Sequence, residues 1–344
     1  MNRPRAAWRW FVAAGVMAIA ASSLVGVGAP VASSATPKPG EPPRVIIDTD
    51  LSRWWDDATV LGIANVLQER GKVRVLGVVS DVPNTVAVAA IDAIDTAYGH
   101  GKTPVGAVTG SEADSFQHGY TDAVVDKLPH SVADSSDVPA AVALYRTLLA
   151  GQPDHSVTIV SLGGYTNLAG LLASKGANGS PLDGRALVAK KTKRLVIMDG
   201  LFPSGGPAFT NQQIDLAAAS AVVDGDWPVP MAWVDGTTGV ATKVGATLCT
   251  TVPANHPMRI VYESLFGCGP PTDGDWDAPA FLYAIGDVPA VFSEAGQGGG
   301  AVINAQGGLS WDDGSTRPND LYVHVADQAA LNQRIDQLLT AAPR

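Results

Sequence analysis

Short apolar runs alternate with amphipathic windows along most of this chain, and this alternation constrains the fold more than any other feature. The apolar runs cover residues 44–47, 73–79, 104–107, 157–161, 194–198 and 229–234, and the helical windows cover 57–68, 85–98, 140–149 and 215–223. Strands that alternate with helices pair in parallel, because each helix crosses over to the next strand. The sequence therefore predicts an α/β fold with a mostly parallel central sheet flanked by helices.

Two segments interrupt this alternation. Residues 109–138 are rich in Gly and Asp, and residues 247–275 contain both cysteines. Both follow predicted strands, where the loops of a parallel sheet often form the walls of a site. Residues 301–325 read as strands and turns before a final helix at 328–339. No linker divides the body, so we expect one domain over residues 44–341.

The first 35 residues have the pattern of a secretion signal. Arg3, Arg5 and Arg9 precede an apolar stretch at 11–27, and small residues follow it. An uncleaved membrane anchor is the alternative, since the stretch is nearly long enough to span a bilayer. The proline-rich segment 36–43 reads as an extended linker. We expect a secreted, extracellular domain that has no membrane contact once the signal is removed.

Charge narrows the class of partner. The chain carries a formal net charge of −10. Removing the signal, which holds three Arg and no acid, moves this balance to about −13. Binding to nucleic acid or to anionic membranes needs clustered Lys and Arg, so we expect neither. A small or cationic partner is expected instead.

The two cysteines, Cys249 and Cys268, lie in one of the interrupting segments. In an exported chain this arrangement favours a disulfide, with two separate thiols as the alternative. Neither is accompanied by a pattern typical of a catalytic cysteine.

Four carboxylates follow the first apolar run within ten residues: Asp48, Asp50, Asp56 and Asp57. A buried strand of a parallel sheet opens at its carboxyl end, where α/β proteins keep their sites. Four like charges there repel one another unless a metal ion or protons neutralise them. Oxygen ligands of this kind favour Ca²⁺ or Mg²⁺. Asp56 or Asp57 alone is equally explained as an acid at a helix start.

Three further segments have polar groups at predicted strand ends. Residues 160–169 run from a strand through two glycines into a helix, and residues 79–84 end a strand at Asn84. Asn84 is equally suited to capping the next helix. Residues 275–283 place an acid, Asp277, at the start of an apolar helix.

These four segments, in this order, resemble the inosine-uridine-preferring nucleoside hydrolase family from residue 44 to about residue 339. The family begins with Asp-x-Asp, a short Gly-containing spacer and Asp-Asp-Ala at a helix start. Here Asp48-Thr49-Asp50 precedes Asp56-Asp57-Ala58. The spacer has five residues, none of them Gly.

The resemblance implies an open α/β fold with Ca²⁺ at the carboxyl edge of the sheet and a water that attacks the anomeric carbon of a ribonucleoside. Carried over by position, Asp50, Asp57 and Asp277 are side-chain calcium ligands, and Leu162 offers its backbone carbonyl. Asp50 also takes the proton of the attacking water. Cleavage of such a bond passes through an oxocarbenium-like state, which surrounding carboxylates stabilise.

The same resemblance assigns the remaining site residues. Asp56, Asn84 and Asn211 match positions that hold the sugar hydroxyls, and Asp48 matches a residue that orients the turn behind the ligands.

Two positions depart from the family. Phe209 occupies the place of a sugar-binding Glu, and Trp276 occupies the place of a His that protonates the departing base. Trp cannot donate a useful proton at neutral pH, although its ring can stack on a base. Among the histidines only His118 is a candidate for the missing acid, and an ordinary surface histidine is its alternative interpretation.

We therefore expect a Ca²⁺-dependent hydrolase of N-glycosidic bonds in ribonucleosides or related N-ribosides, with homo-oligomerisation left open. One alternative is a calcium-retaining, catalytically weak binding protein of the same fold. Another is a phosphatase of the haloacid dehalogenase type, with Asp48 as nucleophile and Asp50 as acid. Ser52 and the pair Lys190-Lys191 are poor matches to that family's later motifs.

Overall fold

Eight strands form the central sheet in the computed structural model, which describes residues 40–83, 85–109, 119–225, 227–315 and 320–343. Their order is β3-β2-β1-β4-β5-β6-β10-β7, and every neighbouring pair is parallel except β10 with β7. The strands are β1 (Arg44–Thr49), β2 (Arg74–Ser80), β3 (Val105–Ala107), β4 (Val157–Ser161), β5 (Thr192–Met198), β6 (Met231–Val234), β7 (Phe292–Ala295) and β10 (Leu321–Val325). A separate hairpin pairs β8 (Gly300–Ile303) with β9 (Leu309–Asp312).

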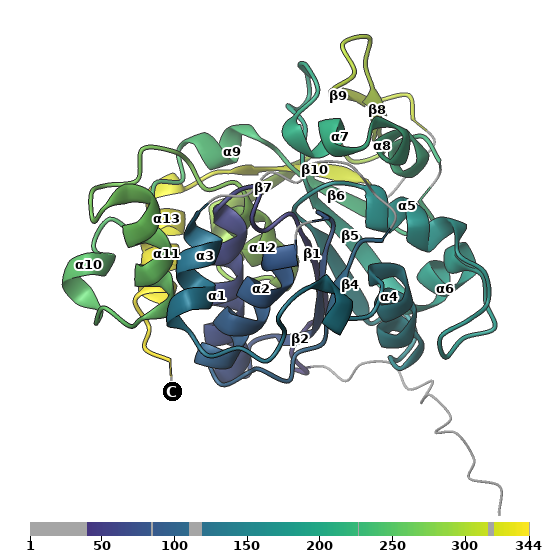
Figure 1. Cartoon of the computed structure of the whole chain (residues 1–344). Helices are drawn as coiled ribbons and strands as arrows, with labels where there is room; N and C mark the ends of the chain where they lie inside the picture. The colour runs from purple at the N-terminus through teal and green to yellow at the C-terminus, as the bar shows by residue number, and fades with distance from the viewer. Residues whose placement is uncertain (1–39, 84, 110–118, 226, 316–319, 344) are drawn as a thin grey trace, which may run out of the picture. The chain divides into compact units, whose positions relative to one another are not determined.

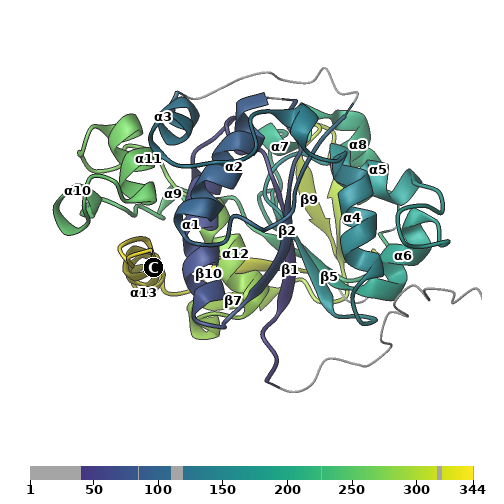
Figure 2. The same cartoon turned by 60° about the horizontal axis from the view of Figure 1, so that its bottom comes forward.

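Helices cover both faces of this sheet (Figure 1, Figure 2). One layer contains α1 (Asp56–Glu69), α2 (Thr85–Ala97), α3 (Tyr120–Lys127), α11 (Pro257–Phe266), α12 (Asp277–Ile285) and α13 (Gln328–Leu339). The opposite layer contains α4 (Ala141–Ala150), α5 (Thr166–Ala173), α6 (Gly184–Lys191) and α8 (Leu216–Val223). Shorter elements are α7 (Thr210–Ile214), α9 (Thr237–Val240), α10 (Leu248–Thr251) and two 3₁₀ turns, Ser135–Asp137 and Pro289–Val291. The predicted α/β fold class is confirmed.

Strand β1 shows why the run Val45-Ile46-Ile47 is apolar without alternation. Val45 and Ile47 belong to the hydrophobic cluster under the first helix layer, whereas Ile46 belongs to the cluster under the second. All three side chains are fully buried. A strand covered on both faces needs apolar residues at every position, which removes the polar alternation of a half-exposed strand.

The order of the strands reverses between β1 and β4. Chain order runs outward from β1 through β2 to β3 on one side, and from β4 through β5 to β6 on the other. Asp48 of β1 pairs with Ser161 of β4, so the two strands end side by side. Ligands of open α/β sheets bind at such a switch point, in the crevice beyond the carboxyl ends of the strands.

Both segments that interrupt the alternation contain helices that the sequence analysis did not predict. Residues 109–138 include α3, and residues 247–275 include α10 and α11. Helix α11 begins with a proline and buries Met258, Ile260, Val261 and Tyr262. The helical spacing of these apolar residues indicates a helix, but the surrounding Gly, Pro and Cys are typical of a loop.

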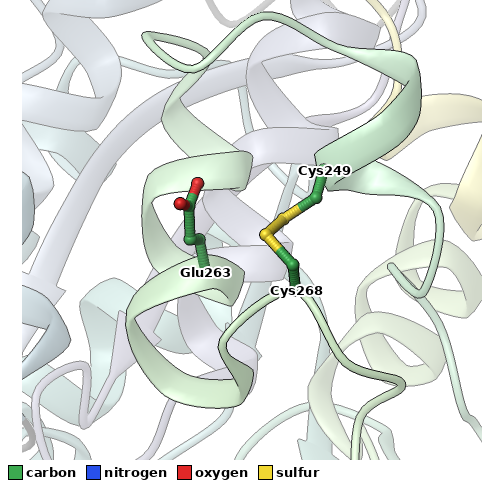
Figure 3. Close-up of side chains that lie close together, drawn as sticks. All are labelled: Cys249, Glu263 and Cys268. Atoms are coloured by element: carbon green, nitrogen blue, oxygen red, sulfur yellow. A yellow bond between two sulfur atoms is a disulfide. The ribbon is translucent and has the colours of Figure 1, made fainter.

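The disulfide joins Cys249 of α10 to Cys268, just beyond α11, with 5.5 Å between the Cα atoms (Figure 3). Glu263 lies beside the two sulfurs, within the spacing of a metal site. Because each sulfur is bonded to the other, neither is a thiolate, and this trio does not provide a metal site.

None of the helices in the described part of the chain has both the length and the apolar character needed to span a membrane. The predicted secretion signal, residues 1–35, lies outside the described residues, as does the first half of the predicted linker 36–43, residues 36–39.

Candidate active site

The loop between β1 and α1 carries the acids of the first motif and is held from outside. Ser52 adopts a left-handed backbone conformation, with φ of 94°, that suits glycine better than serine. The Tyr120 hydroxyl of α3 accepts a hydrogen bond from the Ser52 N–H (3.1 Å) and donates one to the Trp54 carbonyl (2.6 Å). This tyrosine therefore fixes a spacer that contains no glycine.

Three carboxylates lie close together beyond the carboxyl ends of the strands, at the starts of α1 and α12. Asp56 and Asp57 open α1, Asp277 opens α12, and one oxygen of each lies within 4.8 Å of the others. Asp50 follows β1, and its charge raises the pKa of Asp57 and of Asp277. Residues separated by more than 200 positions in the sequence thus form one acidic cluster.

Several oxygens of this cluster are buried but unpaired. Asp50 Oδ2, Asp57 Oδ2 and Asp277 Oδ1 have no hydrogen-bond partner among the described residues. These three side chains are at most 2% exposed. Buried polar atoms are almost always paired, so these oxygens require a proton or a cation. The oxygens that lie close enough to share one ion are those of Asp56, Asp57 and Asp277, and grouped carboxylate oxygens match the ligand preference of a hard divalent ion.

The pKa values show the cost of the arrangement without a cation. Burial raises the pKa of Asp50, Asp57 and Asp277 well above the ordinary range, and neighbouring carboxylates raise it further. Burial and then the charge of Asp57 raise the pKa of Asp56 to about 7. A bound cation would offset this repulsion and favour the charged forms.

The turn after β4 lies directly against Asp50. A Cβ atom on Gly163 would lie 2.7 Å from the Asp50 Cβ, so only glycine permits this approach. The preceding Leu162 is buried, and its carbonyl accepts a hydrogen bond from Asn211 Nδ2 at 2.6 Å. The same nitrogen donates to the Met198 carbonyl at 3.1 Å. With its N–H groups used, Asn211 presents its oxygen as an acceptor.

Asp48 lies behind the cluster. Its carboxylate is fully buried and accepts hydrogen bonds from the Tyr145 hydroxyl (2.8 Å) and Asn167 Nδ2 (3.0 Å). Burial nevertheless raises its pKa to about 7. With both oxygens engaged, Asp48 is placed to hold the strand end and not to act as a nucleophile.

A cavity of about 230 Å³ opens beside the acids. Its walls are largely aromatic and apolar. The lining residues are Trp54, Trp55, Asp56, Met198, Phe209, Thr210, Asn211, Asp273 and Trp276. The cavity therefore joins the carboxylates to a surface that suits a flat ring.

Comparison with known families places this architecture. Residues 45–265 match the family model of the inosine-uridine preferring nucleoside hydrolases. The chain belongs to the nucleoside hydrolase family. Among curated proteins none matches it in sequence.

Solved structures agree with this membership at the level of the fold. The type III effector protein XopQ, solved with adenosine diphosphate ribose, has a TM-score of 0.68 and 16% identity over 89% of this chain and 96% of its own. The inosine-uridine preferring nucleoside hydrolase from Bacillus anthracis has a TM-score of 0.67 and 16% identity over 87% and 99%. The purine-preferring ribonucleoside hydrolase from Gardnerella vaginalis has a TM-score of 0.62 and 16% identity over 86% and 98%.

The two positions that depart from the nucleoside hydrolase pattern are accommodated by glycines after β6. A Cβ on Gly236 would lie 2.4 Å from the Phe209 ring, and a Cβ on Gly239 would lie 2.1 Å from the Trp276 ring. The Trp276 backbone N–H donates to Asp56 Oδ2 at 3.0 Å, and its indole N–H donates to the Gly236 carbonyl at 2.8 Å. Both rings therefore pack closely into the wall of the cavity, in space that the two glycines leave free.

The structure adds an acid that the sequence analysis did not single out. Asp81, the residue after β2, is fully buried, and its charge raises the pKa of Asp50. A Cβ on Gly163 would lie 2.6 Å from Asp81 Oδ2. Asn84, which was predicted from the same strand end to hold a sugar hydroxyl, lies outside the described residues. The signal for Asp81 was its position immediately after the strand.

Two other residues were also missed. Asp275 is fully buried, caps the start of α12 through the Ala278 N–H (2.9 Å) and leaves Oδ2 without a partner in the described structure. Asn167 donates hydrogen bonds to Asp48 Oδ1 at 3.0 Å and to the Ser80 carbonyl at 3.1 Å. His118 lies outside the described residues.

Proposed function

We propose that this protein hydrolyses the N-glycosidic bond of ribonucleosides or related N-ribosides with the help of Ca²⁺. The observation that carries the proposal is the set of buried, unpaired oxygens on Asp50, Asp57 and Asp277 at the switch point of the sheet. Together with the Leu162 carbonyl, these side chains would hold the ion. Membership of the nucleoside hydrolase family supports the same reaction.

The residues divide the chemistry between them. The ion would supply positive charge that makes a neighbouring water easier to deprotonate. Asp50 accepts the proton of that water while the water attacks the anomeric carbon. Asp56 and the oxygen of Asn211 accept hydrogen bonds from the sugar hydroxyls. The surrounding carboxylates stabilise the positive charge that grows on the ring of the sugar.

Asp48 has a supporting role in this proposal. Its bonds to Tyr145 and Asn167 join β1 to α4 and α5, which keeps the start of the acidic loop in place. The phosphatase alternative requires Asp48 as a free nucleophile. A carboxylate with both oxygens bonded in the core does not suit that role.

The test is release of ribose from p-nitrophenyl riboside, which needs no acid to protonate its leaving group. The protein without its predicted signal, residues 1–35, should cleave this compound in calcium buffer, and a chelator should abolish the cleavage. Asp277→Asn should lose activity and calcium binding together. Asp224→Asn, on the exposed end of α8, is the matched control and should keep both.

Calcium binding without cleavage of any riboside would overturn the hydrolase proposal and favour the binding-protein alternative. Cleavage that is indifferent to the chelator would reject the role of the ion while retaining the enzyme.

We further propose that the protein is exported. The predicted signal in residues 1–35 and the Cys249–Cys268 disulfide both favour an oxidising compartment. Mass spectrometry of the protein recovered from its native host should find the N-terminus beyond the signal. A full-length chain retained in membranes would support the anchor alternative instead.

A further inference from the structure

With a cation bound, the carboxylates beside the cavity are charged, and the described lining residues offer no other evident donor for a leaving group. None of the described residues that line the cavity is a His, Lys, Arg, Tyr or Cys. Trp276 occupies the place of the family's acid. Its indole N–H already donates a hydrogen bond to the Gly236 carbonyl. A neutral purine or pyrimidine leaves poorly as an anion, so such a substrate would gain little from these walls.

The walls combine two features that attract cations. Trp54, Phe209 and Trp276 supply aromatic rings, whose faces attract positive charge. Asp56 and Asp273 supply carboxylates, and no described lining residue carries a compensating positive charge. Asp273 is exposed at the rim and bonds only the neighbouring Gly274 N–H among the contacts described. Trp54 is 37% exposed, so its ring is accessible from solvent.

We propose that the preferred substrates are ribosides whose base is already a cation, of the N-ribosylpyridinium type. This inference rests on the proposed hydrolase function and names its substrate class. The aromatic rings and Asp273 bind the flat cationic base, while Asp56 and Asn211 hold the ribose.

The chemistry of such a substrate removes the need for an acid. The bond between the anomeric carbon and the ring nitrogen breaks, and its electron pair neutralises the pyridinium. Water adds to the anomeric carbon and gives up one proton, which Asp50 accepts. The products are ribose, a neutral pyridine and a proton, so atoms and charge balance without a further reagent.

The first experiment compares kcat/KM for nicotinamide riboside, p-nitrophenyl riboside, inosine and uridine in calcium buffer. Nicotinamide riboside should exceed inosine and uridine by about a hundredfold, since only the neutral bases need protonation. Equal or faster cleavage of inosine would overturn the proposal and would indicate that a proton donor reaches the cavity.

The second experiment isolates the charge of the base. Nicotinamide riboside and its uncharged 1,4-dihydro form have nearly the same shape, and their dissociation constants can be measured by calorimetry. The cation should bind about tenfold more tightly, because one exposed carboxylate and the exposed rings each contribute a few-fold. Equal affinity would reject the cation preference even if the protein proved to have no hydrolase activity.

Two variants assign the preference to residues. Asp273→Asn and Trp54→Leu should each lower the ratio of cation to dihydro affinity by about threefold. Asp126→Asn, an exposed acid on α3, is the control and should leave the ratio unchanged. An unchanged ratio in both pocket variants would remove these walls from the explanation.

The outcomes separate the two proposals. Cleavage of p-nitrophenyl riboside with no preference for the cation would reject the substrate class alone. Absence of all cleavage would reject the hydrolase, and the binding ratio would still decide whether the pocket selects cations.

Discussion

Buried aspartates occur in two regions of this protein, and their surroundings differ. Asp92 on α2 is 3% exposed, and its Oδ2 accepts hydrogen bonds from Ser131 Oγ (3.1 Å) and the Val132 N–H (2.9 Å). Asp50 is 1% exposed, yet its Oδ2 has no partner in the described structure. Asp92 fastens the segment after α3 to the helix layer. Burial of an aspartate therefore does not by itself indicate a functional site. Buried carboxylate oxygens that lack a hydrogen-bond partner, beyond the carboxyl ends of the strands, do indicate one.

The largest expected effect contrasts these two acids directly. Asp50→Asn should lower kcat/KM on p-nitrophenyl riboside by about a thousandfold or more, because the base and an ion ligand are lost together. Asp92→Asn should leave kcat/KM within about twofold while lowering the free energy of unfolding by about 1–2 kcal/mol. Steady-state kinetics and urea unfolding measure the two quantities. A large kinetic loss in Asp92→Asn would break the contrast.

The next effect is the response of stability to calcium. Ion binding to the folded state alone should stabilise the protein by about 2.7 kcal/mol at a hundred times the dissociation constant. Differential scanning calorimetry should show a rise of several degrees in Tm on adding Ca²⁺. Asp277→Asn should lose this rise and Asp92→Asn should keep it. The same rise in both variants would place the ion elsewhere.

The smallest effect concerns Asp95, which is intermediate between the two regions. Its Oδ1 accepts a hydrogen bond from Asn65 Nδ2, but its Oδ2 is unpaired in the described structure. Burial raises its pKa to about 7, so below that pH a proton neutralises the carboxylate in the folded protein.

The sign of its pH effect follows from the raised pKa. The folded state keeps the Asp95 proton between about pH 4 and pH 7, while the unfolded state releases it. The free energy of unfolding should therefore decrease as the pH rises through this window. In Asp95→Asn this decrease should be smaller, by up to about 1–3 kcal/mol over the window. Urea unfolding at pH 5 and pH 8, with calcium present, measures the change. An identical slope in wild type and variant would show that Asp95 is ionised when folded.

Much of the fold follows from local patterns in the sequence. β1 and β4 are buried on both faces, so both contain unbroken or nearly unbroken apolar runs, and the final helix has the predicted bounds, Gln328–Leu339. Segments with mixed signals were harder. In α11 the apolar spacing was present, but the flanking Pro, Gly and Cys are equally typical of a loop.

The site was predictable where one motif contained several acids. The residues from Asp48 to Asp57 are such a motif, and the structure brings Asp57 beside Asp277, as the resemblance implied. Asp81 was not found, because its relevance depends on β2 lying next to β1, which spacing alone does not state. The packing of the Phe209 and Trp276 rings could not be predicted either, because the rings occupy space that side chains at Gly236 and Gly239 would fill. The roles assigned to the individual site residues stay predictions for the experiments above.

Helix α11 has a consequence for anyone who prepares this protein. Its Tyr262 and Phe266 meet the edge of Trp55, each at 5.2 Å between ring centroids, and Trp55 also lines the cavity. The same helix lies between the two bonded cysteines. When the disulfide is reduced, the segment that contains α11 loses this cross-link, and we expect the packing of Tyr262 and Phe266 against Trp55 to loosen. Thiol titration of each batch should therefore accompany its kinetics, because samples that differ in this disulfide would differ in the packing around Trp55.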